Sequence, residues 1–168
     1  MVLASKGRFS THQGKNAAGL TRPGLHRLLD ESLRNLGRDT IDLYQLHAFD
    51  PLTPVEETIQ FLDTAVRAGK IHYIGLSNFT GWQFQLFVST AQQMGAAIPV
   101  TLQQQYSLLS RESEWEVIPA ALHNRIGLLP WSPLVLILLA KRDVQREQQK
   151  PTDGAQAHDY RIIIYIVS

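Results

Sequence analysis

The sequence contains no cysteine among its 168 residues. This absence excludes disulfides, thiolate nucleophiles and zinc sites with cysteine ligands. The formal net charge is only +1, so there is no electrostatic reason to expect a nucleic acid or an anionic membrane as partner. No run approaches the ~18 apolar residues that cross a bilayer, and the N-terminus lacks the features of a signal peptide. We therefore expect a cytoplasmic protein.

Two further kinds of motif are missing. No predicted strand is followed by a glycine-rich phosphate turn, and neither GxGxxG nor the P-loop occurs. The histidines other than His47 have no metal-ligand spacing, so we interpret them as surface residues and predict no metal site. They are His12, His26, His72, His123 and His158. The composition, 44% hydrophobic and 18% charged, is typical of one globular domain with a hydrophobic core.

The sequence does contain a regular alternation of strand and helix patterns. Strands restart after roughly 30 residues, the length of one βα unit, and such alternation predicts a parallel sheet. The expected strands lie at residues 2–6, 41–47, 71–76, 100–104 and 127–131. The first two expected helices follow Thr21 and Thr53, the third runs from about Gly81 to Met94, and the fourth lies near Ser113 to Asn124.

Several signals set the predicted helix ends. Thr53 and Glu56 form a capping-box pattern with Pro54 at the first helical position. Glycines follow the first three helices, as expected for left-handed cap residues. Pro119 lies within the fourth helix pattern, so we expect a kink or a late start there.

Each predicted strand ends in a polar or aromatic residue. In a (β/α)8 barrel these ends share one mouth, which favours a barrel over a doubly wound sheet. Five strands cannot close an eight-stranded barrel, so the predicted fold is a partial (β/α)8 TIM barrel of the α/β class, at residues 1–134. Residues 135–168 form a divergent tail, expected to be partly disordered or a lone strand. The strand-end residues are Lys6, His47, Ser77 with Asn78, Gln103 and Trp131.

Five sequence stretches, in the same order and spacing, are similar to those of one family: VLASKGR, LDESLRNLGRDTIDLYQLHAFDP, AVRAGKIHYIGLSNF, TLQQQYSLLSRESEWEVIPA and GLLPWSPL. On these motifs the chain resembles the aldo-keto reductases, NADPH-dependent oxidoreductases built on a (β/α)8 barrel. The likeness corresponds to strands three to seven of that barrel. It is nearest to the bacterial-type members related to potassium-channel β subunits.

The resemblance implies roles for the strand-end residues. Lys6 is similar to the catalytic lysine, whose positive charge lowers the pKa of a neighbouring tyrosine. His47 is similar to the histidine that orients and polarises the substrate carbonyl. Ser77, Asn78 and Gln103 resemble the side chains that hold the nicotinamide carboxamide.

The next positions imply contacts with the rest of the cofactor. Trp131 lies where the family stacks an aromatic ring on the nicotinamide. Ser132 and Leu134 begin the loop that meets the pyrophosphate. After Leu134 the family's glycines are replaced by residues 135–137, and the basic residues for the 2′-phosphate of NADPH have no counterpart.

The resemblance also implies that the family's proton-donating tyrosine and its partner aspartate belong upstream of Met1. Tyr44 does not replace the donor, because its strand parity is opposite to that of His47 and should turn it toward the helices. We therefore expect a truncated or frameshifted gene product with little or no reductase activity of its own.

Structural interpretations of the same residues stay open. Lys6 could be a solvated surface lysine, and His47 a histidine with a purely structural hydrogen bond. Ser77 and Asn78 could cap the next helix, and Trp131 could serve only in packing. Gln103 is favoured over its neighbouring glutamines by strand parity and by a Q-x-x-Y spacing.

Two functions therefore stay open. One is reduction of a small-molecule aldehyde or ketone with NADPH, for which the sequence does not predict the particular substrate. The alternative is a non-catalytic partial barrel that acts as a cofactor-binding or interaction module. In either case an open barrel edge favours self-association.

Overall fold

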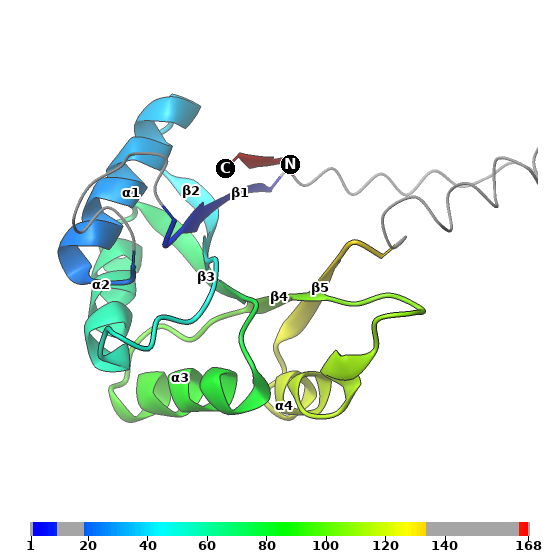
Figure 1. Ribbon diagram of the computed structural model, residues 1–168. Coiled ribbons are helices and arrows are strands. Elements are labelled where there is room, and N and C mark those ends of the chain that lie inside the picture. Colours follow the sequence, from blue (N-terminus) through cyan, green and yellow to red (C-terminus); the bar gives the residue numbers. More distant parts are fainter. Residues whose placement is uncertain (1, 10–18, 134–164, 168) are drawn as a thin grey trace, which may run out of the picture.

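The computed structural model describes residues 2–9, 19–133 and 165–167 (Figure 1). Along the chain the elements are β1 (Leu3–Gly7), α1 (Arg22–Leu36), β2 (Ile41–Leu46), α2 (Val55–Arg67), β3 (Ile71–Ser77), α3 (Gly81–Gln93), β4 (Thr101–Gln105), the 3₁₀ turn η1 (Glu112–Glu114), α4 (Val117–His123), β5 (Gly127–Trp131) and β6 (Tyr165–Val167).

The described strands form one parallel sheet in the order β5-β4-β3-β2-β1-β6. Figure 1 shows the sheet curving, with the four α-helices along one side of it. Neighbouring helices pack in chain order, α1 on α2, α2 on α3 and α3 on α4. The five predicted strands and their alternation with helices are thus confirmed, and the fold is α/β, consistent with part of a (β/α)8 barrel.

β6 adds a strand beyond the five predicted βα units. It pairs in parallel with β1, with Leu3 opposite Tyr165. The domain boundary at residue 134 stays a prediction. In the part of the chain that the structure describes, no helix combines the length and apolarity needed to cross a membrane.

The two faces of the sheet have different roles. The Ser5 hydroxyl is 2.9 Å from the Ser32 hydroxyl on α1, so Ser5 faces the helices and Lys6 faces the opposite side by the period-two rule. Tyr44 is fully buried in the core between sheet and helices. The predicted orientation of Tyr44, toward the helix layer, is therefore confirmed.

Some helix ends agree with the sequence signals. α1 ends at Gly37, whose φ of 60° is the left-handed cap conformation. The fourth helix pattern starts late, because η1 occupies its first turn and α4 begins only at Val117, two residues before Pro119. Proline is tolerated in a first turn, where its missing N–H would have no helical acceptor.

The capping box predicted at Thr53 is wrong. Pro54 is the N-cap residue of α2, and no side chain caps it. The Thr53 hydroxyl instead donates to Asp50 Oδ2 at 2.7 Å. This charge-assisted hydrogen bond turns the Thr53 side chain toward Asp50, and its oxygen caps no amide of α2.

A capping box does form at α3. Thr80 accepts from the backbone at the third helical position, and Gln83 Oε1 accepts from Thr80 N at 3.0 Å. Ser77 and Asn78 lie upstream of this cap. The interpretation of Ser77 and Asn78 as cap residues is therefore wrong.

Gly75 sets the packing of the face that carries Lys6. It lies between Gln45 on β2 and Thr101 on β4 in the strand register. A Cβ at Gly75 would come 2.6 Å from Thr101 Oγ1 and 2.8 Å from Gln45 Cγ. The two polar side chains therefore approach each other only because the residue between them has no side chain.

Gly75→Ala should destabilise the fold by about 1–3 kcal/mol, since overpacking forces strand side chains out of their rotamers. Gly127→Ala is the matched control, because its nearest new contact would be Val100 O at an ordinary 3.6 Å. Urea denaturation of both variants measures the difference. Equal unfolding midpoints for the two variants would contradict this description of the packing.

Candidate active site

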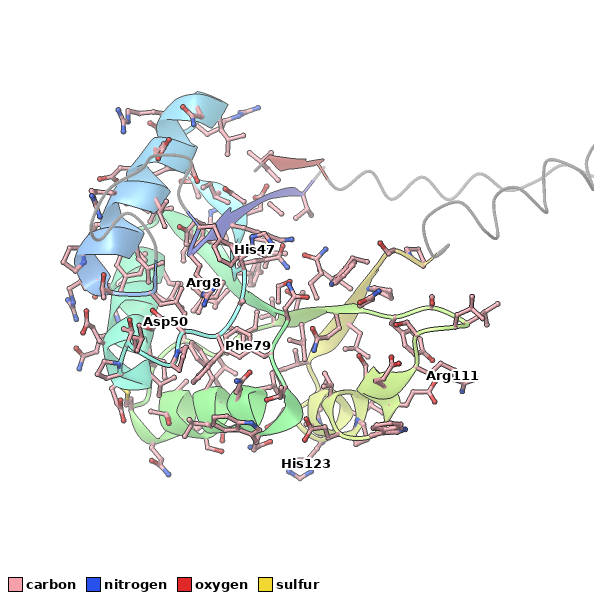
Figure 2. All side chains as sticks on the ribbon, viewed as in Figure 1. Arg8, His47, Asp50, Phe79, Arg111 and His123 are labelled. Atoms are coloured by element: carbon pink, nitrogen blue, oxygen red, sulfur yellow. The ribbon has the colours of Figure 1, made fainter. Side chains whose placement is uncertain are left out.

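The predicted strand-end residues lie at one end of the sheet. His47 N donates to Gly7 O at 2.9 Å, so His47 follows β2 directly beside the end of β1, where Lys6 lies. Ser77 ends β3 and is the register partner of Gln103 on β4. Because parallel strands end at the same edge, these residues lie along that edge, where Figure 2 labels His47.

Asn78 connects three of these strand ends. Its Nδ2 donates to His47 O and to Ser77 Oγ, both at 3.0 Å. Its Oδ1 accepts from Trp131 Nε1, also at 3.0 Å. We call these four residues the Asn78 network. The φ of Asn78 is 56°, a left-handed conformation that asparagine tolerates better than most residues.

The Asn78 network leaves groups that fit a primary amide. Gln103 Oε1 is buried and has no hydrogen-bond partner, so it offers an acceptor for an amide N–H. Ser77 is fully buried. Its oxygen accepts from Asn78, and its own hydrogen remains to donate to an amide oxygen. The donor set therefore suits the nicotinamide carboxamide, with Asn78 orienting Ser77 and keeping one lone pair on Oδ1.

Trp131 borders an open hollow of about 630 Å³ at this end of the sheet. Asn78 and Thr80 line the same hollow together with residues of η1 and the start of α4, whereas Lys6, His47, Ser77 and Gln103 do not line it. Because the indole N–H is bonded to Asn78, the plane of the ring is fixed. Ser132 follows with a φ of 52°, and Leu134 lies outside the described residues. The assigned roles of these positions stay predictions.

The charges around His47 favour its neutral form. Burial lowers the pKa of His47 below its usual 6.5, and the nearby cations Lys6 and Arg8 lower it further. Burial also lowers the pKa of Lys6. A neutral imidazole carries one N–H and at neutral pH can donate it to a carbonyl oxygen.

Tyr44, Tyr73 and Tyr106 do not supply a proton donor beside Lys6 and His47. Tyr44 faces the helices, and burial raises the pKa of its phenol well above the ordinary range. Tyr73 lies near the start of β3, away from Ser77. The Tyr106 hydroxyl donates to Glu114 Oε1 at 2.6 Å.

Asp50 holds the loops around the site. Its Oδ2 accepts from Leu20 N at 2.9 Å and from Thr53 Oγ1, and its Oδ1 accepts from Leu52 N at 3.1 Å. Burial raises the pKa of Asp50, but these hydrogen bonds and the charge of Arg8 outweigh it, and the net shift is downward. Asp50 thus joins the loop after β1 to the loop after β2.

Sequence reasoning missed two residues near the site. Arg8 follows Lys6 and Gly7 at the end of β1, and the strand-end rule that selected Lys6 also points to it. Gln45 lies two residues before His47 on the same face and is 1% exposed, with Nε2 unpartnered. The two-residue period of the strand places Gln45 on the same face as His47, and this pattern could have identified Gln45 from the sequence. Among the described residues, no three possible metal ligands converge.

The fold is that of an α/β protein whose parallel strands end together in a set of polar and aromatic side chains. A family model described as the aldo/keto reductase family matches residues 1–160. The chain belongs to the aldo/keto reductase family.

Three relatives illustrate the family. An aldo-keto reductase of Fusarium vanettenii is 37% identical over 78% of this chain and 35% of its own length. An uncharacterized oxidoreductase, YrpG, of Bacillus subtilis is 43% identical over 69% of this chain and 36% of its own length. The versiconal hemiacetal acetate reductase of Aspergillus parasiticus is 36% identical over 82% of this chain and 40% of its own length. The chain therefore spans between 35% and 40% of the length of these relatives.

Asp50→Asn should lower the unfolding free energy by about 2 kcal/mol at pH 7, because hydrogen bonds to a charged acceptor are lost. The pKa of Asp50 lies below 3.8 in the fold, so its stabilising contribution is complete above pH 3.8 and is lost as the pH falls through the folded value. Urea denaturation at several pH values measures this. Asp39→Asn, at an exposed aspartate, is the control. A gap between Asp50→Asn and wild type that does not narrow in acid would refute the assignment.

Titration of the His47 ring by NMR should give a midpoint below 6.5. Lys6→Met should raise that midpoint, because it removes a nearby positive charge. Lys70→Met is the control, since Lys70 pairs with Asp30 instead. A His47 midpoint that moves equally in both variants would show that Lys6 does not act on His47 electrostatically.

Proposed function

We propose that this chain binds NADPH through its nicotinamide end and supplies the lysine–histidine part of a site that reduces aldehydes or ketones. The observation that carries the proposal is the buried, unpartnered Gln103 Oε1 beside the Ser77 hydroxyl. A buried acceptor without a partner costs free energy. A carboxamide would satisfy this acceptor and receive the serine hydrogen in return.

The residues have separate roles in this proposal. Ser77 and Gln103 bind the carboxamide, Asn78 fixes Ser77, and Trp131 presents its ring to the nicotinamide face. The cofactor, when bound, supplies the hydride that reduces the carbonyl carbon. Ser132 and Leu134 would continue the cofactor contacts toward the pyrophosphate.

Lys6 and His47 act on the carbonyl oxygen. Neutral His47 donates a hydrogen bond to this oxygen, which draws electron density away from the carbonyl carbon. Lys6 places a positive charge beside the oxygen as negative charge develops there, and favours the ionised form of any phenol next to it. Tyr44, Tyr73 and Tyr106 place no phenol beside Lys6, so we propose that reduction by this chain alone is slow.

A non-catalytic role is the second candidate. The orientation of Tyr44 supports it, because the tyrosine nearest His47 in the chain faces the helix layer. In this alternative the Asn78 network binds cofactor without turnover. Preference for NADPH over NADH, self-association through open barrel edges and a cytoplasmic location stay predictions.

Fluorescence titration with NADPH tests the proposal. We expect saturable quenching of tryptophan emission, with binding weakened at least tenfold in Gln103→Leu, because the variant cannot accept the amide hydrogen. Gln92→Leu, an exposed glutamine on α3, is the control. Trp131→Ala should weaken binding as well, and a parallel titration with NADH compares the two cofactors.

Absence of saturable NADPH binding up to millimolar concentration would contradict the cofactor proposal. Equal weakening in Gln103→Leu and Gln92→Leu would also contradict it, because the buried acceptor would then have no special role. With binding established, turnover of a panel of aldehydes separates the two candidate functions.

A further inference from the structure

Arg8 has an unusual backbone conformation at the end of β1. Its φ is 124°, in the region that favours glycine. Hydrogen bonds hold the backbone on both sides, from His47 N to Gly7 O at 2.9 Å and from Gly19 N to Arg8 O at 2.8 Å. Strain of this kind persists where the surrounding structure enforces it, and it concentrates at functional sites.

The charge of Arg8 has no anionic partner among the described residues. Its Nε is buried without a hydrogen bond, and the guanidinium forms no ion pair in the described part of the chain. The charge of Arg8 contributes to the lowered pKa of Asp50. Figure 2 shows Arg8 between His47 and Asp50. However, the Asp50 oxygens already accept from Leu20, Leu52 and Thr53.

Phe9 connects Arg8 to His47. The Arg8 guanidinium carbon lies 4.6 Å from the centre of the Phe9 ring. The same ring meets the His47 imidazole edge-on, with 5.1 Å between ring centres. Phe9 is 54% exposed. An open aromatic surface, one ring wide, therefore joins the imidazole to an unpaired cation.

We propose that Arg8 binds a carboxylate carried by the carbonyl substrate, while the carbonyl oxygen of the same molecule lies at His47. This inference rests on the proposed function and adds a substrate class to it, namely aldehydes or ketones that bear a carboxylate. A guanidinium favours a carboxylate because it can donate two parallel hydrogen bonds. Binding the carboxylate also satisfies a donor that is buried without a partner.

The probe is 4-formylbenzoate, compared with its uncharged methyl ester, in NMR titrations of the 168-residue chain. We expect formylbenzoate to bind at least tenfold more tightly than the ester, since a hydrogen bond to a charged group exceeds a neutral one. Added salt should reduce this preference. In Arg8→Gln the preference should disappear. In Arg67→Gln, where an exposed arginine pairs with Asp63, the preference should persist.

Arg8→Gly is the second variant. Glycine adopts a φ of 124° without strain, so this chain should fold at least as stably as the wild type and still lose the preference for the carboxylate. Loss of preference in Arg8→Gly therefore supports the proposal even where Arg8→Gln fails to fold. A preference that survives in Arg8→Gly overturns it.

Other outcomes also overturn the proposal. These are equal binding of acid and ester, absence of formylbenzoate binding at millimolar concentration, and displacement of formylbenzoate by an equal concentration of inorganic phosphate. The last would make Arg8 a site for small anions in general.

The NADPH titration distinguishes failure of the Arg8 proposal from failure of the cofactor proposal. NADPH binding without a carboxylate preference refutes only the role of Arg8, whereas the preference without NADPH binding refutes the cofactor proposal.

Discussion

The site depends on one side chain, the amide of Asn78. Three hydrogen bonds from this amide reach the backbone after β2, the last side chain of β3 and the indole at the end of β5. Strands that are not neighbours in the sheet are thereby fixed relative to each other at their carboxyl ends. The left-handed backbone of Asn78 turns its amide toward these partners. Without this connection, the strand ends would share an edge but not a defined geometry.

The two faces of the sheet differ in polarity: the helix-facing side is mainly apolar, and the opposite face carries polar side chains. The helix-facing side holds apolar residues such as Leu46 and Leu76, fully buried under the helices, which supplies the hydrophobic stabilisation. The opposite face carries Gln45, Thr101 and Gln103, each with a buried polar atom that lacks a partner. Unsatisfied polar atoms weaken a fold. Three such atoms thus lie on the face opposite the helices, whereas the unpartnered Tyr44 hydroxyl lies under them.

The sequence was sufficient for the elements and for the end of the sheet where the site lies. The strands agree with their predicted positions to within about one residue, because the alternation of strand and helix patterns is regular. Lys6, His47 and Gln103 were identified by a rule that depends only on parallel strands ending together. Tyr44 was correctly excluded by parity alone.

Contacts between distant loops were not predictable in the same way. Thr53 has the pattern of a helix cap, but its hydroxyl donates to Asp50, three residues earlier in the same loop, and this local alternative was overlooked. Thr80 caps α3 in place of Ser77 and Asn78, because the Asn78 amide is already bonded to other strands. Arg8 was overlooked because an unpaired charge is recognised only when the possible partners are located. The partners of Asn78 and the lack of a partner for Arg8 depend on three-dimensional proximity rather than on local pattern.

The most direct measurement is the nitrogen–proton NMR spectrum of the indole groups during addition of NADPH. The three tryptophan signals can be assigned with Trp131→Phe and Trp115→Phe. If the Asn78 network forms and binds nicotinamide, the Trp131 signal will be protected from exchange and will shift to saturation, while the signal of Trp82, an exposed residue on α3 outside the hollow, stays in place. An unprotected Trp131 signal, or one that does not respond to NADPH, would contradict the claim that these strand ends form a cofactor site.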